Sequence, residues 1–337
     1  MKIKDFGEFN IIDYISNSLN NDVIQSSLKD SLNISIGVGD DTAVWDVNSK
    51  TQLATTDTMV DKVHFDTERC NLADIGWKAM ATNLSDIASM AGVPTTALIT
   101  LGLPGEMEIS EFKNLYQGII ECASMYNTTI IGGDIVKSPI LFITVALYGV
   151  NQNIILTRSA LNVGDFIGIT DFTGLSKGGL ELSSKSEELY NNIPEENIRL
   201  LLNSHYRPKP KIDDGTILAN LGATSAMDIS DGLFSDLNKM LVSSQLSAKI
   251  NYSSIPIHPL LSQIFPESAF EMATNGGEDY ELLFGIPSDK LDSLNSLLPN
   301  SHIIGQACSG NIGTIELTRN DKVYKLDKFD GWDHFKQ

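Results

Sequence analysis

Strand-like runs alternate with helix-like runs along most of this chain, and this alternation constrains the fold more than any other feature. In the first half, the β-branched and apolar runs QLATTD (52–57) and LFITVALYGV (141–150) flank longer runs with helical periodicity, chief among them LADIGWKAMATNLSDIASMAG (72–92). A further strand, FIGITD (166–171), begins a second series. Such alternation is typical of an α/β protein with α+β mixed sheets on which helices pack.

The length of 337 residues is too great for one ordinary domain and suits two of typical size. The segment NQNIILTRSALNVGD (151–165) has the character of a hairpin and turn between the two series. We therefore expect an N-terminal domain over 1–152 and a C-terminal α/β domain over 153–337.

Charge and cysteine content exclude several classes of function. The chain has 24 Lys and Arg against 43 Asp and Glu, a net charge of −19, which repels nucleic acid and anionic membranes. Such a protein would bind an anionic substrate only with cations that offset the repulsion. Cys70, Cys122 and Cys308 are far apart in sequence and show no metal-ligand spacing, so reduced thiols and a cytoplasmic location are expected. We find neither a signal-peptide pattern nor a bilayer-spanning segment.

Acidic residues beside Gly, Ser or Thr at the junctions of apolar runs are the candidate functional groups. They occur in GDDTAV (Asp40, Asp41), TTD (Asp57), NLSDIASM (Asp86), IIGGD (Asp134), AMDISDGL (Asp228, Asp231) and NGGEDYELLF (Glu278, Asp279). Several directly follow a predicted strand, where ligands bind in α/β folds and small residues let them approach the backbone. In TTDTMVDKVHF (55–65) we expect Thr55, Thr56 and Asp57 at the exit of a strand, followed by a second short strand at VHF.

Asp86 gives the sharpest argument for a bound ligand. The apolar stripe of its predicted helix runs through Met80, Leu84, Ile87 and Ala91, and Asp86 stands at the edge of that stripe. A carboxylate so near a core must be hydrogen-bonded, paired or bound to a metal. Many carboxylates without a His or Cys cluster favour a hard cation such as Mg²⁺, which commonly bridges protein carboxylates to substrate phosphates.

Each of these signals also has a structural interpretation that the residues alone leave open. Asp57 could cap a turn, and Ser230 could be a helix N-cap. The run GLSKGGLEL (174–182) could cradle an anion or form an ordinary strand-to-helix turn, and it lacks the Walker A spacing. Arg158 could meet a phosphate or a carboxylate, while His64 and Trp332 could serve only packing.

The strings GDDTAV, TTDTMVDKVHF, GWKAMATNLSDIASMAG, IIGGD, LTRSA, AMDISDGL, NGGEDYELLF and GWDHF lie in order from residue 39 to residue 335. Together they resemble the thiamine-monophosphate kinase family, of the ATP-binding superfamily that also contains aminoimidazole ribonucleotide synthetase. The resemblance implies two domains of the synthetase-like type, a homodimer joined through N-terminal sheets, and ATP- and Mg²⁺-dependent phosphorylation of thiamine monophosphate to thiamine diphosphate. Direct in-line transfer fits a site without an evident nucleophile.

The resemblance also implies residue roles, which we carry over by motif. The implied metal ligands are Asp41, Thr55, Thr56, Asp57, Asp86, Asp134, Asp228 and Asp231. The implied ATP contacts are Tyr116, Gly133, Asp134, Arg158 and Ser230. The implied contacts to thiamine phosphate are His64, Glu278 and Trp332. Lys62 stands where the family more often has a small residue, and the run at 174–182 receives no role.

Rival functions come from the same superfamily and from outside it. A selenophosphate synthetase would need a reactive Cys near the N-terminus, and a hydrogenase-maturation protein would end in a Cys-bearing tail, whereas this sequence ends in DHFKQ. An aminoimidazole ribonucleotide synthetase is the strongest enzymatic alternative. A non-catalytic nucleotide sensor is the alternative from another class.

Overall fold

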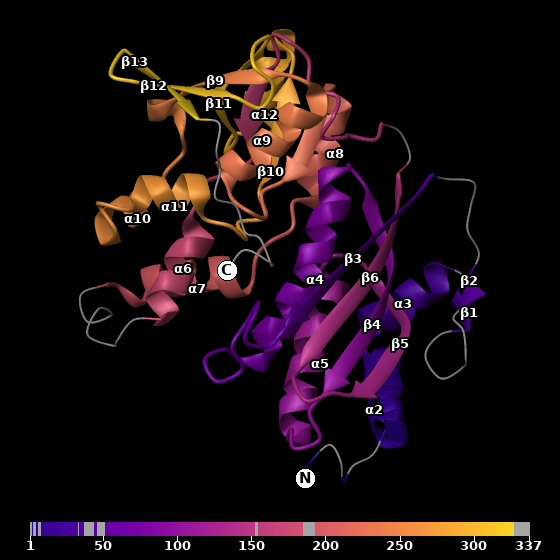
Figure 1. Ribbon diagram of the computed structural model, residues 1–337. Helices are drawn as coiled ribbons and strands as arrows, with labels where there is room; N and C mark the ends of the chain where they lie inside the picture. The colour runs from indigo at the N-terminus through magenta and orange to yellow at the C-terminus, as the bar shows by residue number, and fades with distance from the viewer. Residues whose placement is uncertain are drawn as a thin grey trace. The chain divides into compact units, whose positions relative to one another are not determined.

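The computed structural model describes residues 2, 5, 8–32, 34–36, 44–45, 51–151, 154–184 and 193–326. Its contacts divide the chain into two units (Figure 1). The N-terminal unit comprises Met1–Ile87 and Gly92–Gln152, and the C-terminal unit comprises Ala88–Ala91 and Asn153–Gln337. Each unit contains its own sheet of four or more strands.

The N-terminal unit is built on a four-stranded sheet of order β3-β6-β4-β5. Its elements are α2 (Glu8–Asn21), α3 (Val23–Ser31), β1 (Ile34–Ile36), β2 (Val44–Trp45), β3 (Thr51–Val60), α4 (Leu72–Ser89), β4 (Val93–Leu103), α5 (Ile109–Met125), β5 (Thr129–Lys137) and β6 (Phe142–Asn151). β6 pairs antiparallel with both β3 and β4, and β4 pairs parallel with β5. β1 and β2 form a separate small ribbon.

The strand that carries Asp57 is longer than the sequence indicates. β3 continues to Val60, because it pairs with β6 without interruption from Thr51 to Val60. Asp57 therefore lies within the strand, and the prediction that it falls at the strand exit is wrong. The predicted strand VHF is also wrong, since these residues form a turn in which the N–H groups of Val63 and His64 donate to the carbonyl of Val60.

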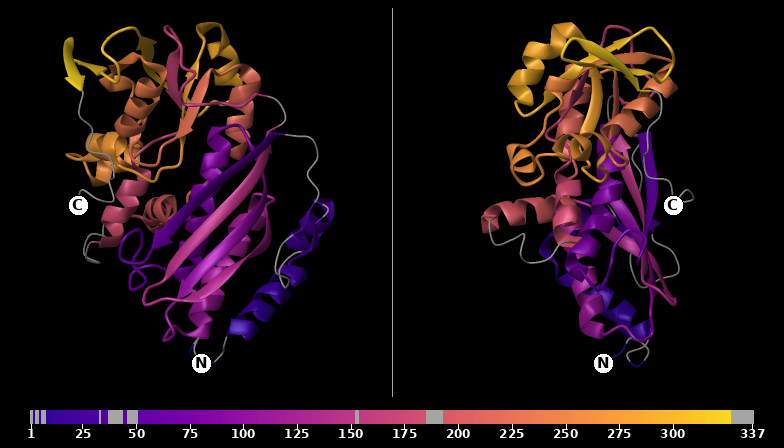
Figure 2. Two further views of the ribbon diagram at one scale, coloured as in Figure 1. Left: turned by 45° about the vertical axis from the view of Figure 1, so that its right-hand side comes forward. Right: turned by 60° about the vertical axis from the view of Figure 1, so that its left-hand side comes forward.

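Helices α4 and α5 pack on one face of this sheet (Figures 1 and 2). Their backbones meet at two glycines. A Cβ at Gly118 would lie 1.8 Å from the carbonyl oxygen of Ala73, and one at Gly76 would lie 2.1 Å from that of Leu115. The helix backbones therefore approach closely, as only Gly permits. The predicted stripe of α4 is buried, with Met80 and Leu84 fully enclosed.

The C-terminal unit is built on a seven-stranded sheet of order β13-β12-β9-β11-β7-β10-β8. Its strands are β7 (Phe166–Ile169), β8 (Ser225–Asp228), β9 (Ser247–Asn251), β10 (Leu282–Ile286), β11 (His302–Cys308), β12 (Ile315–Arg319) and β13 (Lys322–Leu326). Its helices are α6 (Leu175–Ser184), α7 (Glu195–Tyr206), α8 (Ile212–Leu221), α9 (Leu233–Ser244), α10 (Pro259–Ile264), α11 (Ala269–Asn275) and α12 (Leu291–Leu297), with short 3₁₀ turns at Tyr252–Ser254 and Ser288–Lys290.

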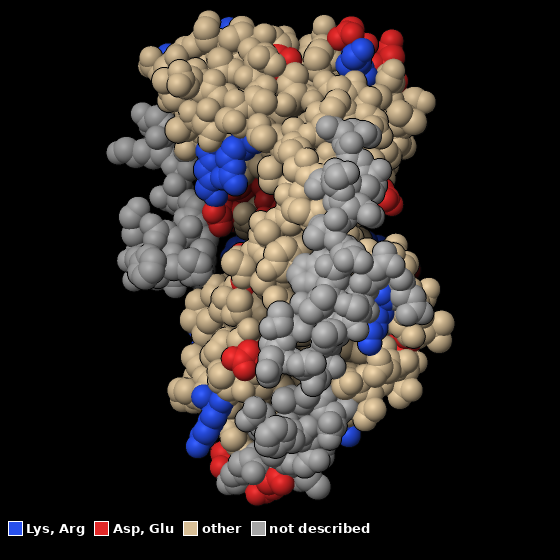
Figure 3. Space-filling model, turned by 90° about the vertical axis from the view of Figure 1, so that its right-hand side faces the viewer, with Lys and Arg blue, Asp and Glu red and all other residues tan. Residues whose placement is uncertain are grey.

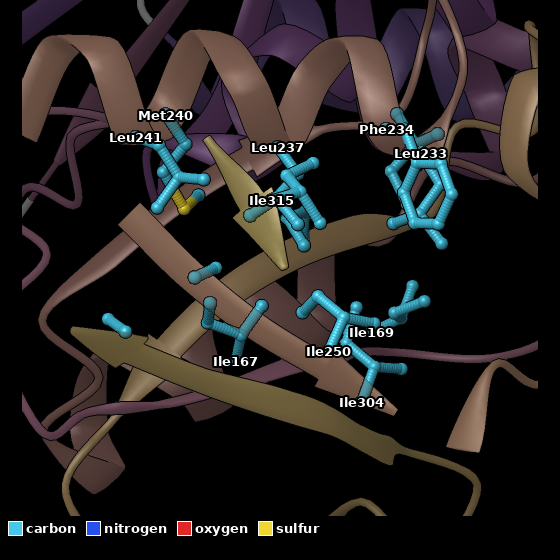
Figure 4. Close-up of a cluster of buried hydrophobic side chains, with 14 of the residues drawn as sticks. Ile167, Ile169, Leu233, Phe234, Leu237, Met240, Leu241, Ile250, Ile304 and Ile315 are labelled. Carbon is cyan, nitrogen blue, oxygen red and sulfur yellow. The ribbon is translucent and has the colours of Figure 1, made fainter. Parts of the chain in front are cut away.

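The main core of this unit lies between α9 and the sheet (Figure 4). Leu237 and Met240 of α9 pack against strand residues such as Ile167, Ile250 and Ile315, all of them nearly or fully enclosed. A second core joins α8 and α12 to the sheet, and a third joins α6, α7, α10 and α11. The prediction of an α/β protein with mixed sheets is confirmed.

Surface character also bears on the function. On the face drawn in Figure 3, the described Lys and Arg side chains are scattered and form no continuous basic surface. None of the described helices combines the length and the apolar character that crossing a membrane requires.

Candidate active site

The first group of candidate residues lies between β3 and α4 of the N-terminal unit. Residues alternate between the two faces of a strand, and Leu53 and Met59 of β3 are buried. Thr55 and Asp57 share their parity and so point to the face that α4 covers. The hydroxyl of Thr55 donates to Oδ2 of Asp86 at 2.5 Å. α4 continues through Asp86 as predicted, so helix capping does not explain this carboxylate.

Asp57 lies two residues after Thr55 in β3, on the same face of the strand. Burial of its carboxyl raises the pKa of Asp57, while a hydrogen bond from Thr82 and the charge of His64 act in the opposite direction. The residue as a whole keeps solvent contact, so this desolvation is partial. His64 itself is held by the turn after β3, where its Nδ1 accepts the N–H of Val60 at 3.0 Å. The structure thus brings Thr55, Asp57, Asp86 and His64 into one neighbourhood.

The chemistry of this donor set suits a hard cation. Hydroxyl and carboxylate oxygens are the ligands that Mg²⁺ prefers. Beside them, Oδ1 of Asn83 is buried without a hydrogen-bond partner, and its Nδ2 donates to the hydroxyl of Thr82 at 3.2 Å. Among the described residues, no group of three or more acidic, His or Cys side chains is close enough to hold a metal ion by itself. Asp41, a further predicted ligand, lies outside the described residues.

Gly133 and Asp134 lie at the far edge of the same sheet. The register places Asp57, Val145, Ile99 and Gly133 in one row across the four strands. Asp134 belongs to the next row, opposite Thr100, and therefore points to the other face of the sheet. Three strand spacings of about 4.8 Å separate the two edges. Within one chain the structure does not bring Asp134 together with Asp57, so a shared metal stays a prediction.

Thr56 and Tyr116 also lie apart from this group. Thr56 alternates with its neighbours onto the open face, and its hydroxyl donates to the carbonyl of Val145 at 3.0 Å. Tyr116 is 2% exposed on α5, with its ring centroid 5.9 Å from that of Phe112. This position is that of a core residue, and an ATP contact by Tyr116 stays a prediction without structural support.

The second group lies at one end of the sheet in the C-terminal unit. β8 ends at Asp228, which pairs with Leu282 at the start of β10. Beyond this pair, the N–H of Glu278 donates to the carbonyl of Ser230 at 2.8 Å, and that of Tyr280 to the carbonyl of Ile229 at 2.9 Å. The predicted residues Asp228, Ser230, Asp231 and Glu278 are therefore brought together.

A buried carboxylate holds the loop between β8 and α9. Oδ2 of Asp236 accepts the N–H groups of Ser230 and Asp231, at 3.0 and 2.9 Å, and its Oδ1 accepts from Lys239 at 2.7 Å. Lys239 also pairs with Asp231. The N-cap of α9 is Gly232, so the alternative interpretation of Ser230 as that cap is wrong.

The run at 174–182 comprises the residue before α6 and most of that helix. The N–H groups at the start of the helix already have an acceptor. The carboxyl oxygens of Asp279 accept the N–H groups of Gly174 at 2.6 Å and Ser176 at 3.0 Å. The start of this helix therefore binds a carboxyl group of the protein itself. Burial raises the pKa of Asp279 to about 7, against the effect of these two hydrogen bonds.

A second buried acid follows two residues later. Oε1 of Glu281 lies 3.0 Å from Nζ of Lys211, and its Oε2 accepts the hydroxyl of Thr170 at 2.5 Å. Burial raises the pKa of Glu281 to about 7, although Lys211 opposes the shift. Lys211 also lies 3.8 Å from Asp171.

The raised pKa of Glu281 predicts a pH dependence of stability. Because the folded pKa of about 7 exceeds the ordinary 4.5, this residue contributes most below pH 4.5, and its contribution is lost as the pH rises through 7. We expect Glu281→Gln to remove this slope. The unfolding free energy of the wild type minus that of the variant should then fall between about pH 4.5 and 7, as measured by urea denaturation. A difference that stays constant or rises would contradict the shift.

Arg158 and Trp332 complete the predicted set. The carbonyl of Arg158 accepts the hydroxyl of Ser244 at 3.0 Å, at the C-terminal end of α9. Ser230 and Asp231 precede the other end of this 12-residue helix, about 18 Å away at 1.5 Å per residue. The backbones of Arg158 and Ser230 therefore lie at opposite ends of α9. Trp332 lies outside the described residues.

Sequence reasoning missed the residues that support these side chains. Thr82 lies one helical turn before Asp86, and that spacing on a buried face could have identified it. His205 and Asp236 are buried in helices, and no local pattern distinguishes them from packing residues.

Comparison with known proteins defines the class of protein. The profile of the family described as "AIR synthase related protein, N-terminal domain" matches residues 39–151. The thiamine-monophosphate kinase of Bacillus subtilis (strain 168) is 32% identical over 313 residues, which cover 90% of this chain and 94% of that protein. That of Haemophilus influenzae is 35% identical over 317 residues, covering 90% and 93%. The chain belongs to the thiamine-monophosphate kinase family, and the prediction that it is a kinase of this kind is confirmed.

Solved structures agree with this assignment. AaThiL complexed with AMPPCP and TMP is 31% identical, has a TM-score of 0.75, and the match covers 99% of each chain. The thiamine-monophosphate kinase from Stenotrophomonas maltophilia K279a is 28% identical with a TM-score of 0.79, over 89% of this chain and 95% of that one. The hydrogenase maturation protein HypE in complex with ATP is only 15% identical at a TM-score of 0.73, which shows the shared fold alone.

Proposed function

We propose that this enzyme phosphorylates thiamine monophosphate to thiamine diphosphate with ATP and Mg²⁺, by direct in-line transfer in the cytoplasm. The observation that carries the proposal is the match, over 99% of the chain, to a relative solved with AMPPCP and TMP. The net charge of −19 supports the need for metal ions, because an acidic protein must neutralise a polyphosphate before binding it. Among the described residues of the site there is no evident covalent nucleophile, as expected of phosphoryl transfer.

Thr55, Asp57 and Asp86 are the proposed core of the metal site, together with Asp41. Mg²⁺ bound there would neutralise the phosphate charge that develops during transfer. Thr55 orients the carboxylate of Asp86 through its hydroxyl, and Thr82 does the same for Asp57. Thr56, Asp134, Asp228 and Asp231 are proposed as further metal ligands.

The proposed contacts to the nucleotide and to the acceptor are made by different residues. We assign ATP to Gly133, Asp134, Arg158 and Ser230, with Tyr116 as the weakest member of the predicted set. We assign thiamine phosphate to His64, Glu278 and Trp332. A cationic thiazolium and a flat pyrimidine suit a carboxylate and an aromatic face.

The direct test is an assay of the purified protein with ATP, Mg²⁺ and thiamine monophosphate. We expect thiamine diphosphate and ADP in equal amounts, and no product when EDTA removes the metal. ADP formation without thiamine diphosphate would indicate transfer to water, the only other acceptor in the mixture, and would contradict thiamine monophosphate as the acceptor. Nucleotide binding without turnover under any metal condition would favour a sensor and overturn the proposal.

We also propose that the protein is a homodimer with a C₂ axis, joined through the N-terminal sheet. Opposite α4 and α5, the described part of this sheet shows an open face (Figure 2, left). Half-buried Phe142, Ala146 and Tyr148 of β6 and the 40%-exposed Val136 of β5 lie on it. Exposed apolar side chains on a sheet face favour pairing with an identical face.

Sedimentation should detect this dimer at micromolar concentration. Ala146→Arg places a charge in the middle of the open face and should yield monomers. Gln117→Arg, on the exposed side of α5, is the matched control and should remain dimeric. A wild-type monomer, or a dimeric Ala146→Arg variant, would contradict an interface at this sheet.

A further inference from the structure

The segment that carries Glu278 has an unusual backbone. Glu278 and Tyr280 have φ angles of +64° and +53°, in the left-handed region that non-Gly residues rarely adopt. Each such residue carries backbone strain. Two of them on either side of Asp279 persist only because surrounding contacts hold the segment.

Asp279 supplies two of these contacts through its side chain. Its two carboxyl oxygens each accept one N–H at the start of α6, from Gly174 at 2.6 Å and from Ser176 at 3.0 Å. The neighbouring glycines permit this docking, since a Cβ at Gly277 would lie 2.6 Å from the carbonyl of Ser230 and one at Gly174 would lie 2.7 Å from the backbone of Ala273. The side chain of Asp279 thereby fixes the backbone of the residue before it.

The side chain of Glu278 is linked to the same helix start. Oε2 of Glu278 lies 3.5 Å from Nδ1 of His205, and the two form an ion pair when the imidazole is protonated. The same nitrogen lies 3.1 Å from the hydroxyl of Ser176. His205 is 5% exposed, and its ring packs edge-on against Tyr206 with centroids 4.8 Å apart. The first turn of α6 therefore positions Glu278 in two ways: its backbone through Asp279, and its side chain through His205.

We propose that Asp279 and His205 are positioning residues for the acceptor substrate. They connect Glu278 to the first turn of α6, Asp279 through the backbone of Glu278, and His205, in α7, through its side chain. The inference rests on the proposed contact between Glu278 and thiamine monophosphate. It assigns a function to α6, whose N-terminal amides bind Asp279 instead of a phosphate. Loss of either link should weaken binding of the acceptor and leave the nucleotide unaffected.

Asp279→Asn tests the backbone link. The two N–H groups bind different oxygens of Asp279, so an amide can accept only one of them and directs its own N–H₂ at the other. We expect the KM for thiamine monophosphate to rise about tenfold, and the KM for ATP to stay within about twofold. His205→Phe tests the side-chain link, because it keeps a ring in the packed position and removes Nδ1. We expect a rise of about threefold in the same KM alone.

Asp165→Ala is the control for lost stability, because it removes the oxygen that accepts both hydrogen bonds of this side chain. Asp165 is 6% exposed and accepts the N–H of Asn162 and the hydroxyl of Thr224, at the opposite end of β7 from Thr170. We expect it to lower the melting temperature and leave both KM values unchanged. Should Asp279→Asn not fold, His205→Phe decides alone.

The outcomes separate this inference from the proposed function. A wild type that makes no thiamine diphosphate overturns the function itself. An active wild type whose folded variants leave the KM for thiamine monophosphate unchanged, or raise both KM values equally, overturns only the positioning roles.

Discussion

Asp57→Asn and Asp86→Asn should each lower kcat by about 100-fold or more, with the fold intact. Each change keeps the size of the side chain and removes one negative charge from the proposed metal site. A loss of about 3 kcal/mol of charge stabilisation in the transition state corresponds to a factor of this size. Steady-state kinetics over a range of Mg²⁺ concentrations measure the effect, and higher Mg²⁺ should recover part of the activity.

The stability of the same variants gives an independent readout. Burial raises the pKa of Asp57, so the ionised carboxyl is disfavoured in the metal-free protein. Asp57→Asn should therefore leave the metal-free melting temperature unchanged or raise it. Asp74→Asn, in the first turn of the same helix as Asp86, is the control and should keep full activity. Normal turnover by both site variants at limiting Mg²⁺ would refute a metal site at these carboxylates.

Gly133→Ala should destabilise the N-terminal unit by about 3 kcal/mol or more. A Cβ at this position would lie 1.8 Å from the carbonyl oxygen of Ile99 on the neighbouring strand. Backbone atoms cannot move aside as a side chain can, so the strands β4 and β5 must separate locally. Thermal denaturation without nucleotide measures the loss apart from any effect on ATP binding.

Gly132→Ala is the control for this change. Its Cβ would meet only the end of the Leu98 side chain, at 3.1 Å, and a small rotation of that side chain relieves the contact. We expect a change below about 1 kcal/mol. Equal effects of the two substitutions would show that the close approach of Gly133 to Ile99 does not limit stability.

The sequence predicted the elements better than the geometry of the site. The stripe through Met80 and Leu84 correctly identified the buried face of α4, because helical periodicity is a local property. The exit of β3 was misplaced, because pairing with β6 extends the strand past Asp57. The turn at His64 was read as a strand for a related reason, since the apolar neighbours of this residue give no sign of the backbone hydrogen bonds that close the turn.

The sequence alone determined the family of this enzyme and the residue types at its site, because motif order and the chemistry of carboxylates and hydroxyls are written in the chain. Tertiary structure decided which of those residues meet. Strand parity and sheet order bring Thr55 and Asp57 to Asp86 and place Asp134 on another face and another edge. Tertiary structure also decided that the N–H groups at the start of α6 bind the carboxyl group of Asp279 and not an external anion. The sequence could not show this, because the contact joins residues more than 100 positions apart.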